Sequence, residues 1–337
     1  MKNIIKKITA AALSLSMLFA LTACGGEATS GSQVENATYK VAIVKQMDHP
    51  SLDEIANAVA AELDAIESEG SVDFEYEIYS GQGDQSVLMQ IGNQAVADGV
   101  DAIIPIATTA AQVIALCAEE AKIPVIFAAV SDPAKAELVD IDHVTGVSDA
   151  LNTEFIMNMM LAQNPDVKNV GLLYSLSEPN SATPIAEAKD YLDAKGITYT
   201  EATANTNDEV IAAANTLVAQ GVDAVFTPTD NIIMSAELAI YESLIAAGIP
   251  HYTGADSFVR SGAFTTCGVN YTELGGQAAR LAYQAMTEGM TSVADDFVLA
   301  EGGIITVNTE TAAALNIDYN AVFGNMGPIV EVTTSAD

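Results

Sequence analysis

Short apolar segments alternate with longer stretches of helical periodicity along most of the chain. The segments are rich in Val and Ile and apolar at successive positions, which is typical of parallel strands buried on both faces. The predicted strands are residues 40–45, 74–79, 102–106, 124–128 and 144–147, followed by a second series at 170–174, 198–202, 224–227 and 251–254. The pattern therefore predicts an α/β chain with helices covering both faces of parallel sheets.

The two series repeat each other in short phrases. Residues 97–104 (ADGVDAII) align with 219–226 (AQGVDAVF), and Ile-Pro occurs at both 123–124 and 249–250. In each half a helix ends at Gly and Pro opens the next strand, where it is tolerated. Either match alone could arise by chance, but two matches at nearly the same offset favour two related lobes. About 300 residues, half of them apolar, suffice for two cores.

The first residues are typical of a secretion signal. Lys2, Lys6 and Lys7 precede an apolar run, 8–21, that is short for a membrane span. The run ends in Leu-Thr-Ala-Cys, which resembles a bacterial lipobox and would make a diacylglycerol-bearing Cys24 the first mature residue. We therefore expect a signal peptide at 1–23 and a flexible lipidated tether at 24–38. The alternative is an ordinary cleaved signal that happens to contain a cysteine.

Charge and cysteine usage exclude several partners. Without the signal, 9 basic residues face 45 acidic ones, a formal charge of −36. Such a surface lacks the basic footprint of nucleic-acid binding and is repelled by anionic lipid, so only the anchor is expected to touch the membrane. Cys117 and Cys267 have no close-spaced partner. Neither a disulfide framework nor a cysteine metal site is expected.

Polar residues follow most of the predicted strands. Ligand crevices of open parallel sheets lie beyond the carboxyl ends of the strands. The ligand-binding candidates at these ends are Met47, His49, Ser51, Asp84, Thr108, Thr109, Ser131, Asp132, Glu178, Asn180, Ser181, Thr229, Asp230, Asn231 and Asp256. Helix capping explains any one of them, but helix N-termini from two lobes facing one cleft also make an anion site.

Several of these segments carry a family resemblance. In the first half they are Asp48-His49-Pro50-Ser51-Leu52-Asp53, Gly83-Asp84-Gln85-Ser86, 107–112 (ATTAAQ), 123–133 (IPVIFAAVSDP) and 145–149 (TGVSD); in the second they are Tyr174, 177–181 (SEPNS), 227–231 (TPTDN) and 271–275 (YTELG). In this order they closely resemble the ABC-transporter substrate-binding lipoproteins typified by tryptophan and other aromatic amino-acid binders. The resemblance covers about 40–289 and implies a type I periplasmic-binding fold with three hinge crossings and no catalysis.

The resemblance also implies how the chain is divided. The N-terminal lobe would comprise 39–148 plus 270–302, and the C-terminal lobe 149–269 plus 303–330, with 331–337 as a loose tail. A helix at 271–287 would cover the first lobe and add Asn270 and Tyr271 to the binding residues. Cys117 and Cys267 would lie on different lobes, too far apart to bridge.

Enzyme interpretations find little support. His49, His143 and His251 show no metal-binding spacing, and residues 81–83 (GQG) lack the third glycine of a dinucleotide fingerprint. No spacing singles out a nucleophile beside a base. We therefore expect no catalytic residue, metal or cofactor. A different class remains open, a sensor subunit that binds the same solute and signals to a receptor or kinase; a neighbouring permease and ATPase gene would argue against it.

The chemistry of the candidates points to the ligand class. Arg260 and Arg280 are the only arginines, so the sequence offers few groups that could bind a phosphate or a dicarboxylate. A single carboxylate can instead bind at Thr108 and Thr109 or at Asn180 and Ser181. For an ammonium group the first choice of acceptor is Asp256 and the next is Asp230. Possible apolar walls are Met47, Leu52, Phe258 and Tyr271.

The sequence thus predicts an extracytoplasmic binding lipoprotein that captures a hydrophobic or aromatic amino acid in a cleft between two lobes. We expect a monomer, lipid-anchored to the outer face of the cytoplasmic membrane, that delivers its solute to an ABC permease and its ATPase.

Overall fold

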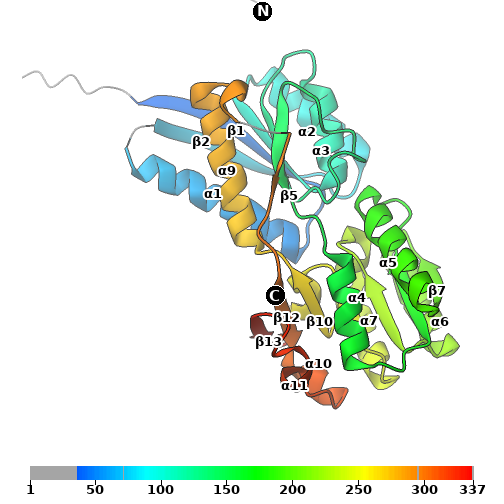
Figure 1. The fold of residues 1–337 in the computed structure, drawn as a ribbon. Helices are drawn as coiled ribbons and strands as arrows, with labels where there is room; N and C mark the ends of the chain where they lie inside the picture. Colours follow the sequence, from blue (N-terminus) through cyan, green and yellow to red (C-terminus); the bar gives the residue numbers. More distant parts are fainter. Residues whose placement is uncertain (1–35, 71, 294–295, 336–337) are drawn as a thin grey trace, which may run out of the picture. The chain divides into compact units, whose positions relative to one another are not determined.

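The computed structural model describes residues 36–70, 72–293 and 296–335. The predicted signal peptide, Cys24 and nearly all of the predicted tether lie outside this range. In the described part, no helix has both the length and the apolar character needed to cross a bilayer. The described residues form two sheets flanked by helices (Figure 1), and we call the parts built on them the first and second lobes.

The first lobe has a six-stranded parallel sheet in the order β11-β5-β4-β3-β1-β2. Its strands are β1 (Ala37–Lys45), β2 (Val72–Ser80), β3 (Ala102–Ile106), β4 (Val125–Ala128), β5 (Val144–Ser148) and β11 (Val298–Leu299). One face packs against α1 (Pro50–Ser68) and α9 (Tyr271–Glu288), the other against α2 (Gln85–Ala97) and α3 (Thr108–Ala118) (Figure 1). Both faces are covered, as expected for successive apolar strand positions.

The second lobe has a seven-stranded sheet in the order β13-β12-β10-β9-β8-β6-β7. Its strands are β6 (Asn169–Tyr174), β7 (Thr198–Thr203), β8 (Ala224–Thr227), β9 (His251–Thr253), β10 (Thr265–Gly268), β12 (Ile304–Asn308) and β13 (Ile329–Val332). All neighbours are parallel except β10 and β12. The antiparallel pair arises where the chain enters this sheet for the last time.

Helices cover both faces of the second sheet as well. They are α4 (Thr153–Gln163), α5 (Ala182–Lys195), α6 (Asn207–Gln220), α7 (Asn231–Ala246), α8 (Asp256–Arg260), α10 (Thr309–Ala314) and α11 (Tyr319–Phe323). A 3-10 turn at Pro179–Ser181 precedes α5, and another at Met290–Ser292 follows α9 of the first lobe. Helices α4 and α5 belong to one apolar core and α6 and α7 to another. The predicted fold of two α/β lobes is confirmed, and each predicted strand overlaps an observed one.

Two predicted boundaries are wrong. The tail expected from 331 is paired as far as Ser335: Val332 pairs with Asn308, and the Ser335 amide donates to the Arg260 carbonyl at 2.9 Å. The expected tether ends earlier than 38, because Ala37 and Thr38 pair with β2. Neither segment is a continuous apolar run, and both are held by backbone hydrogen bonds that a hydropathy pattern does not reveal.

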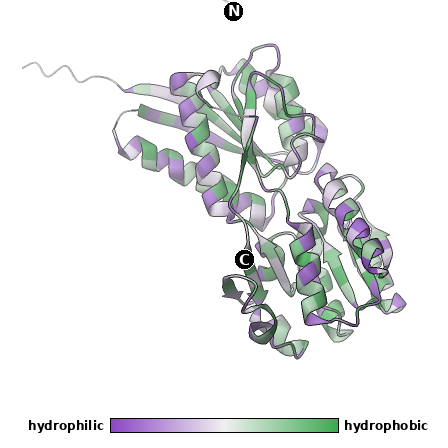
Figure 2. Cartoon of the chain, in the orientation of Figure 1, coloured by the Kyte–Doolittle hydropathy of each residue, from purple (hydrophilic) through white to green (hydrophobic). Residues whose placement is uncertain are grey.

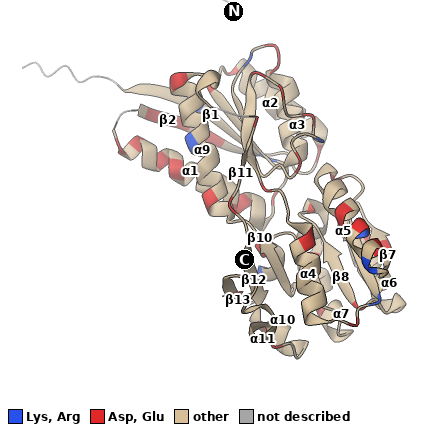
Figure 3. Ribbon diagram, viewed as in Figure 1, with Lys and Arg blue, Asp and Glu red and all other residues tan. Residues whose placement is uncertain are grey.

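The apolar core links the lobes. Figure 2 shows hydrophobic residues concentrated on the strands and on the inward faces of the helices. Leu52 and Tyr271 of the first lobe belong to the same buried cluster as Met234 and Phe258 of the second. Acidic side chains spread over the helices of both lobes, with few basic ones among them (Figure 3). Most of the charge is therefore peripheral, and one apolar cluster is shared by the two lobes.

Candidate functional site

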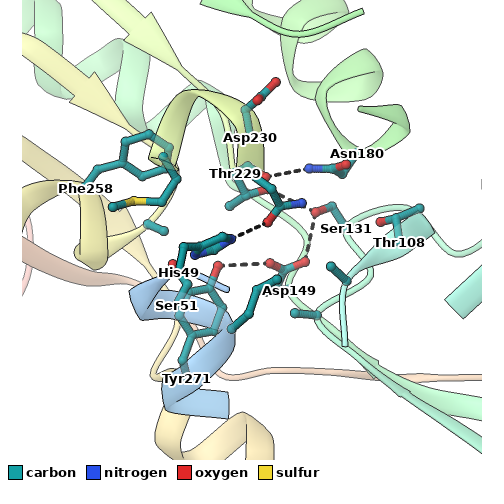
Figure 4. A pocket seen from close by; sticks show the side chains of 16 residues that line it. His49, Ser51, Thr108, Ser131, Asp149, Asn180, Thr229, Asp230, Phe258 and Tyr271 are labelled. Atoms are coloured by element: carbon teal, nitrogen blue, oxygen red, sulfur yellow. Dashed lines mark hydrogen bonds between the residues drawn. The ribbon is translucent and has the colours of Figure 1, made fainter. Parts of the chain in front are cut away.

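A pocket lies at the carboxyl ends of the strands of both sheets (Figure 4). Nine predicted ligand-binding residues line it: His49, Ser51, Thr108, Ser131, Asn180, Thr229, Asp230, Asn231 and Tyr271. The rest of the lining comprises Leu52 and Phe258, which were considered as apolar walls, together with Ala107, Ala129, Asp149, Met234 and Ala255. The expectation that ligand-binding residues follow the strands therefore locates this pocket.

The other eight predicted residues lie outside the lining, and helix capping accounts for two of them. Asp84 accepts from the amides of Ser86 and Val87 and caps α2, and Asn270 accepts from the Glu273 amide and caps α9. Thr109 is buried in the first turn of α3, and Met47 is half-buried against the first-lobe core. The remaining four are Asp132, Glu178, Ser181 and Asp256.

Asp256, the first choice for an ammonium acceptor, is already paired. Its carboxylate forms an ion pair with Arg260 one helical turn later, and Arg260 also bonds Glu54 of α1 at 2.6 Å. The second choice, Asp230, does line the pocket, but its two oxygens accept from the amides of Ser175, Ile232 and Ile233 and from the Ser181 hydroxyl. Asp230 is thus held locally through both oxygens, whereas Asp256 is held through Oδ2 and its buried Oδ1 has no hydrogen-bond partner in the described structure.

Asp149 is the acid that the strand-end search did not select. It follows β5, where the chain leaves the first sheet, and only 4% of it is exposed. Ser131 Oγ donates to its carboxylate at 2.9 Å and the Tyr271 hydroxyl does so at 3.1 Å (Figure 4). Burial raises the pKa of Asp149, against the two hydrogen bonds, which lower it. Because burial disfavours the ionised form, a cationic partner beside Asp149 would stabilise its carboxylate.

The N-terminus of α3 opens on the same pocket. The first N–H groups of a helix have no intrahelical partner, and within the described part of the chain no side chain caps α3. The Thr108 hydroxyl is buried there without a hydrogen-bond partner in the described structure. This end of the pocket therefore offers donors to an anion.

Two alanines at this edge have unusual backbones. Ala107 and Ala129, at the ends of β3 and β4, have φ of 78° and 57°. Left-handed conformations are costly for residues other than glycine, and they persist where the surroundings impose them, often at binding sites. Both residues line the pocket, and the turn at Ala107 leads directly into α3.

Several hydrogen bonds cross between the lobes at the pocket. Ser131 and Thr229 lie 3.1 Å apart through their hydroxyls, and His49 Nε2 lies 2.9 Å from Asn231 Oδ1. The Asp132 carboxylate accepts from the Thr183 hydroxyl at 2.7 Å. Both lobes therefore contribute to the walls, so a bound molecule would contact both.

The remaining wall is apolar. Phe258 is buried, and its ring meets the His251 ring edge-on with centroids 6.4 Å apart. Leu52 and Met234 come from opposite lobes beside it. In Figure 4, Phe258 lies on the opposite side of the view from Thr108. The pocket thus combines an anionic group, donors for an anion, and an apolar surface.

The described residues do not provide the ligand set of a metal site. Among the described residues no group of three or more His, Cys, Asp or Glu side chains could hold a metal ion. Cys117 and Cys267 are free thiols, one on α3 of the first lobe and one on β10 of the second.

Comparisons with known proteins agree with this geometry. Residues 40–323 match the family model for ABC transporter substrate binding proteins. A tyrosine-binding protein of Clostridioides difficile (strain R20291) is 30% identical over 329 residues, 94% of this chain and 93% of that protein.

Two solved structures are similar over nearly the whole described chain. One is an ABC domain from Streptococcus pneumonia in complex with L-Trp, 29% identical, covering 87% of this chain and 100% of its own with a TM-score of 0.79. The other is the ligand-free, open structure of a Clostridium difficile substrate binding protein with adhesive properties, 25% identical, covering 88% and 100%, with a TM-score of 0.65.

Proposed function

Because the chain belongs to the family of ABC transporter substrate-binding proteins, we propose that it captures a hydrophobic or aromatic amino acid as a zwitterion between its two lobes. Proteins of this family are extracytoplasmic and bind small solutes, and the same applies to this chain. Its relatives are binding proteins, not enzymes. The single observation that carries the proposal is the buried Asp149 carboxylate in the same pocket as the uncapped end of α3.

Asp149 is the proposed acceptor for the ammonium group, in place of Asp256. A buried carboxylate gains most from a cation that also donates hydrogen bonds, and an amino-acid ammonium has three N–H donors. Ser131 and Tyr271 occupy part of the carboxylate and fix its orientation. This arrangement leaves the remaining acceptor sites of Asp149 for the ligand.

The ligand carboxylate is proposed to lie at the start of α3. The Thr108 hydroxyl is a buried donor without a partner in the described structure, and the adjacent helix end favours negative charge. No arginine lines the pocket. Such a site suits a single carboxylate better than a phosphate, which would need stronger charge compensation.

The ligand side chain is proposed to lie against Leu52, Phe258 and Met234. Aromatic rings prefer edge-to-face and offset contacts of the kind that Phe258 already makes with His251. Support for an aromatic ligand comes from the relatives, one named for binding tyrosine and one solved with L-Trp.

Anchoring and delivery complete the proposal. Cys24 is proposed to carry the lipid, leaving a monomeric binding body outside the cytoplasmic membrane that hands its solute to an ABC permease and its ATPase. Within the described residues, no observation specifically favours the sensor alternative. We therefore propose import alone.

Calorimetry with a matched ligand series tests the proposal. L-Tyr, L-Trp, L-Phe and L-Leu would be compared with the N-acetyl and the amide derivative of the best binder. We expect one or more free amino acids to bind and both derivatives to fail, because each lacks one of the two charges. Retained binding of the N-acetyl derivative would remove the ammonium assignment, and binding of sugars alone would overturn the ligand class.

A further inference from the structure

Glu178 lies beside the pocket but not in its lining. Only 4% of it is exposed, and both carboxyl oxygens have partners. Gln46 Nε2 donates to Oε1 at 2.7 Å, and Asn231 Nδ2 donates to Oε2 at 2.6 Å. Gln46 follows β1 in the first lobe, whereas Glu178 follows β6 in the second. The carboxyl group therefore joins the two lobes directly.

The network then returns to the first lobe. Because Asn231 uses its Nδ2 on Glu178, its Oδ1 is the acceptor that faces His49 Nε2 at 2.9 Å. Burial lowers the pKa of His49, so the ring is neutral and carries its proton on Nε2. Gln46 begins and His49 ends the loop between β1 and α1. One second-lobe carboxyl group thus fixes this loop at two points.

We propose that Glu178 is a positioning residue that latches the two lobes over the ligand without touching it, and that it takes up a proton when they close. This inference rests on the proposed binding of a ligand between the lobes. It assigns to Glu178 a role in how long the ligand stays bound, rather than in which ligand is chosen.

The surroundings of Glu178 explain the proton. Burial and the negative charge of Asp230, at the start of α7, raise the pKa of Glu178 to about 8, against the hydrogen bonds from Asn231 and Gln46. His49, just before α1, is the first-lobe titratable group that faces this network, and it is neutral. Lys45 at the end of β1 is paired with Asp48 and Asp53. Within the described network no cation pairs with Glu178.

Opening would remove this environment. If Gln46 and His49 withdraw with the first lobe, Glu178 becomes hydrated and its pKa returns towards about 4.3. At a solution pH between these two pKa values, the Glu178 carboxyl group is protonated in the closed form and ionised in the open form. Gln46 Oε1 is buried without a partner in the described structure, so a rotation of the Gln46 amide would let it accept the new O–H.

Asp149 does not mimic this effect. The proposed ligand brings an ammonium to Asp149, which offsets the burial of that carboxylate on closure. Nothing supplies a charge to Glu178. Proton uptake on ligand binding is therefore expected from Glu178 alone.

Calorimetry in buffers of different ionisation enthalpy measures this uptake. L-tyrosine and L-tryptophan would be titrated at pH 6.5 in phosphate and in imidazole buffer. The wild type is expected to take up a net fraction of a proton per ligand, because the uptake by Glu178 is partly offset by the proton that His49 releases when burial lowers its pKa, and its affinity should fall as the pH rises from 6 to 7.5. Glu178→Gln should lose this uptake and show only the proton release from His49, so that its affinity no longer falls as the pH rises.

The latch itself is tested by dissociation kinetics. Gln46→Ala and Glu178→Ala should each release the ligand about 5- to 50-fold faster than the wild type, since each breaks the bond between the lobes. The matched controls are Gln94→Ala and Glu187→Gln, two exposed positions on α2 and α5. Melting temperatures would be recorded to show that each variant is folded.

The outcomes separate the two proposals. If none of L-Tyr, L-Trp, L-Phe and L-Leu binds the wild type, the proposed function fails and this inference fails with it. Binding without proton uptake, or uptake that persists in Glu178→Gln, would overturn only the proton assignment to Glu178. Dissociation rates in Gln46→Ala and Glu178→Ala equal to those of the controls would overturn the latch.

Discussion

The hydroxyl of Tyr271 donates a hydrogen bond to the Asp149 carboxylate at 3.1 Å, across 122 positions of sequence. Asp149 stands where the chain leaves the first sheet, and Tyr271 opens the helix with which the chain returns to that lobe. The pocket acid therefore lies at one crossing between the lobes and is held by a residue at another. A change in how the lobes meet would alter the surroundings of this carboxylate.

Removing the Tyr271 hydroxyl should shift the pH dependence of binding. The hydrogen bond from Tyr271 lowers the pKa of Asp149, so Tyr271→Phe should raise that pKa further. An ammonium ligand requires ionised Asp149, so the affinity of the variant should begin to fall at a higher pH than that of the wild type as the solution is acidified. Titrations between pH 4 and 7 measure the two profiles. Superimposable profiles would show that Asp149 does not hold the ammonium.

Thr108→Val tests the proposed carboxylate site. The substitution keeps the shape of the side chain and removes the unpaired buried hydroxyl, so a hydrogen bond to a charged ligand group is lost. We expect a loss of about 1.5–3 kcal/mol in binding, or roughly 10- to 150-fold in affinity. Its neighbour provides the control, because Thr109 is buried but outside the lining. Equal losses in Thr108→Val and Thr109→Val would point to a general disturbance of α3.

Cys24→Ser tests the proposed anchor. Without the thiol no diacylglycerol can be attached, so the variant should leave the membrane fraction and appear in the soluble one. The binding body is unchanged, so its affinity for the ligand should stay at the wild-type value. Fractionation followed by calorimetry on the released protein measures both. A variant that remains in the membrane fraction would show that another element holds the protein there.

The fold was predictable because strands such as β3 and β4 are apolar at every position. Segments such as 102–106 are buried on both faces and leave a continuous run that sequence alone reveals. Strands β10 to β13 were not predicted individually, because they are short or polar and are defined by their backbone partners. The segment 265–268 (TTCG) forms a strand because β9 and β12 lie on either side of it.

The site was predictable in part, for a similar reason. Polar residues between a strand and a helix can be found by pattern, and Thr108 and Ser131 were identified in this way. Asp149 was not selected, because it follows a strand where the chain crosses to the other lobe. Asp256 was preferred as the ammonium acceptor, although an arginine four residues later on the same helix signals a local ion pair.

The affinity of Asp149→Asn for the best amino-acid ligand is the most direct test of the central claim. The substitution keeps the size of the side chain and removes the charge that the ammonium needs, so we expect a loss of about 2–4 kcal/mol, roughly 30-fold to nearly 1,000-fold. Calorimetry would be paired with thermal melting, and the melting temperature without ligand should not fall, because a buried charge has been removed. Asp256→Asn is the matched comparison and should lose much less affinity. Wild-type affinity in Asp149→Asn, or a larger loss in Asp256→Asn, would contradict the assignment of Asp149 as the ammonium site.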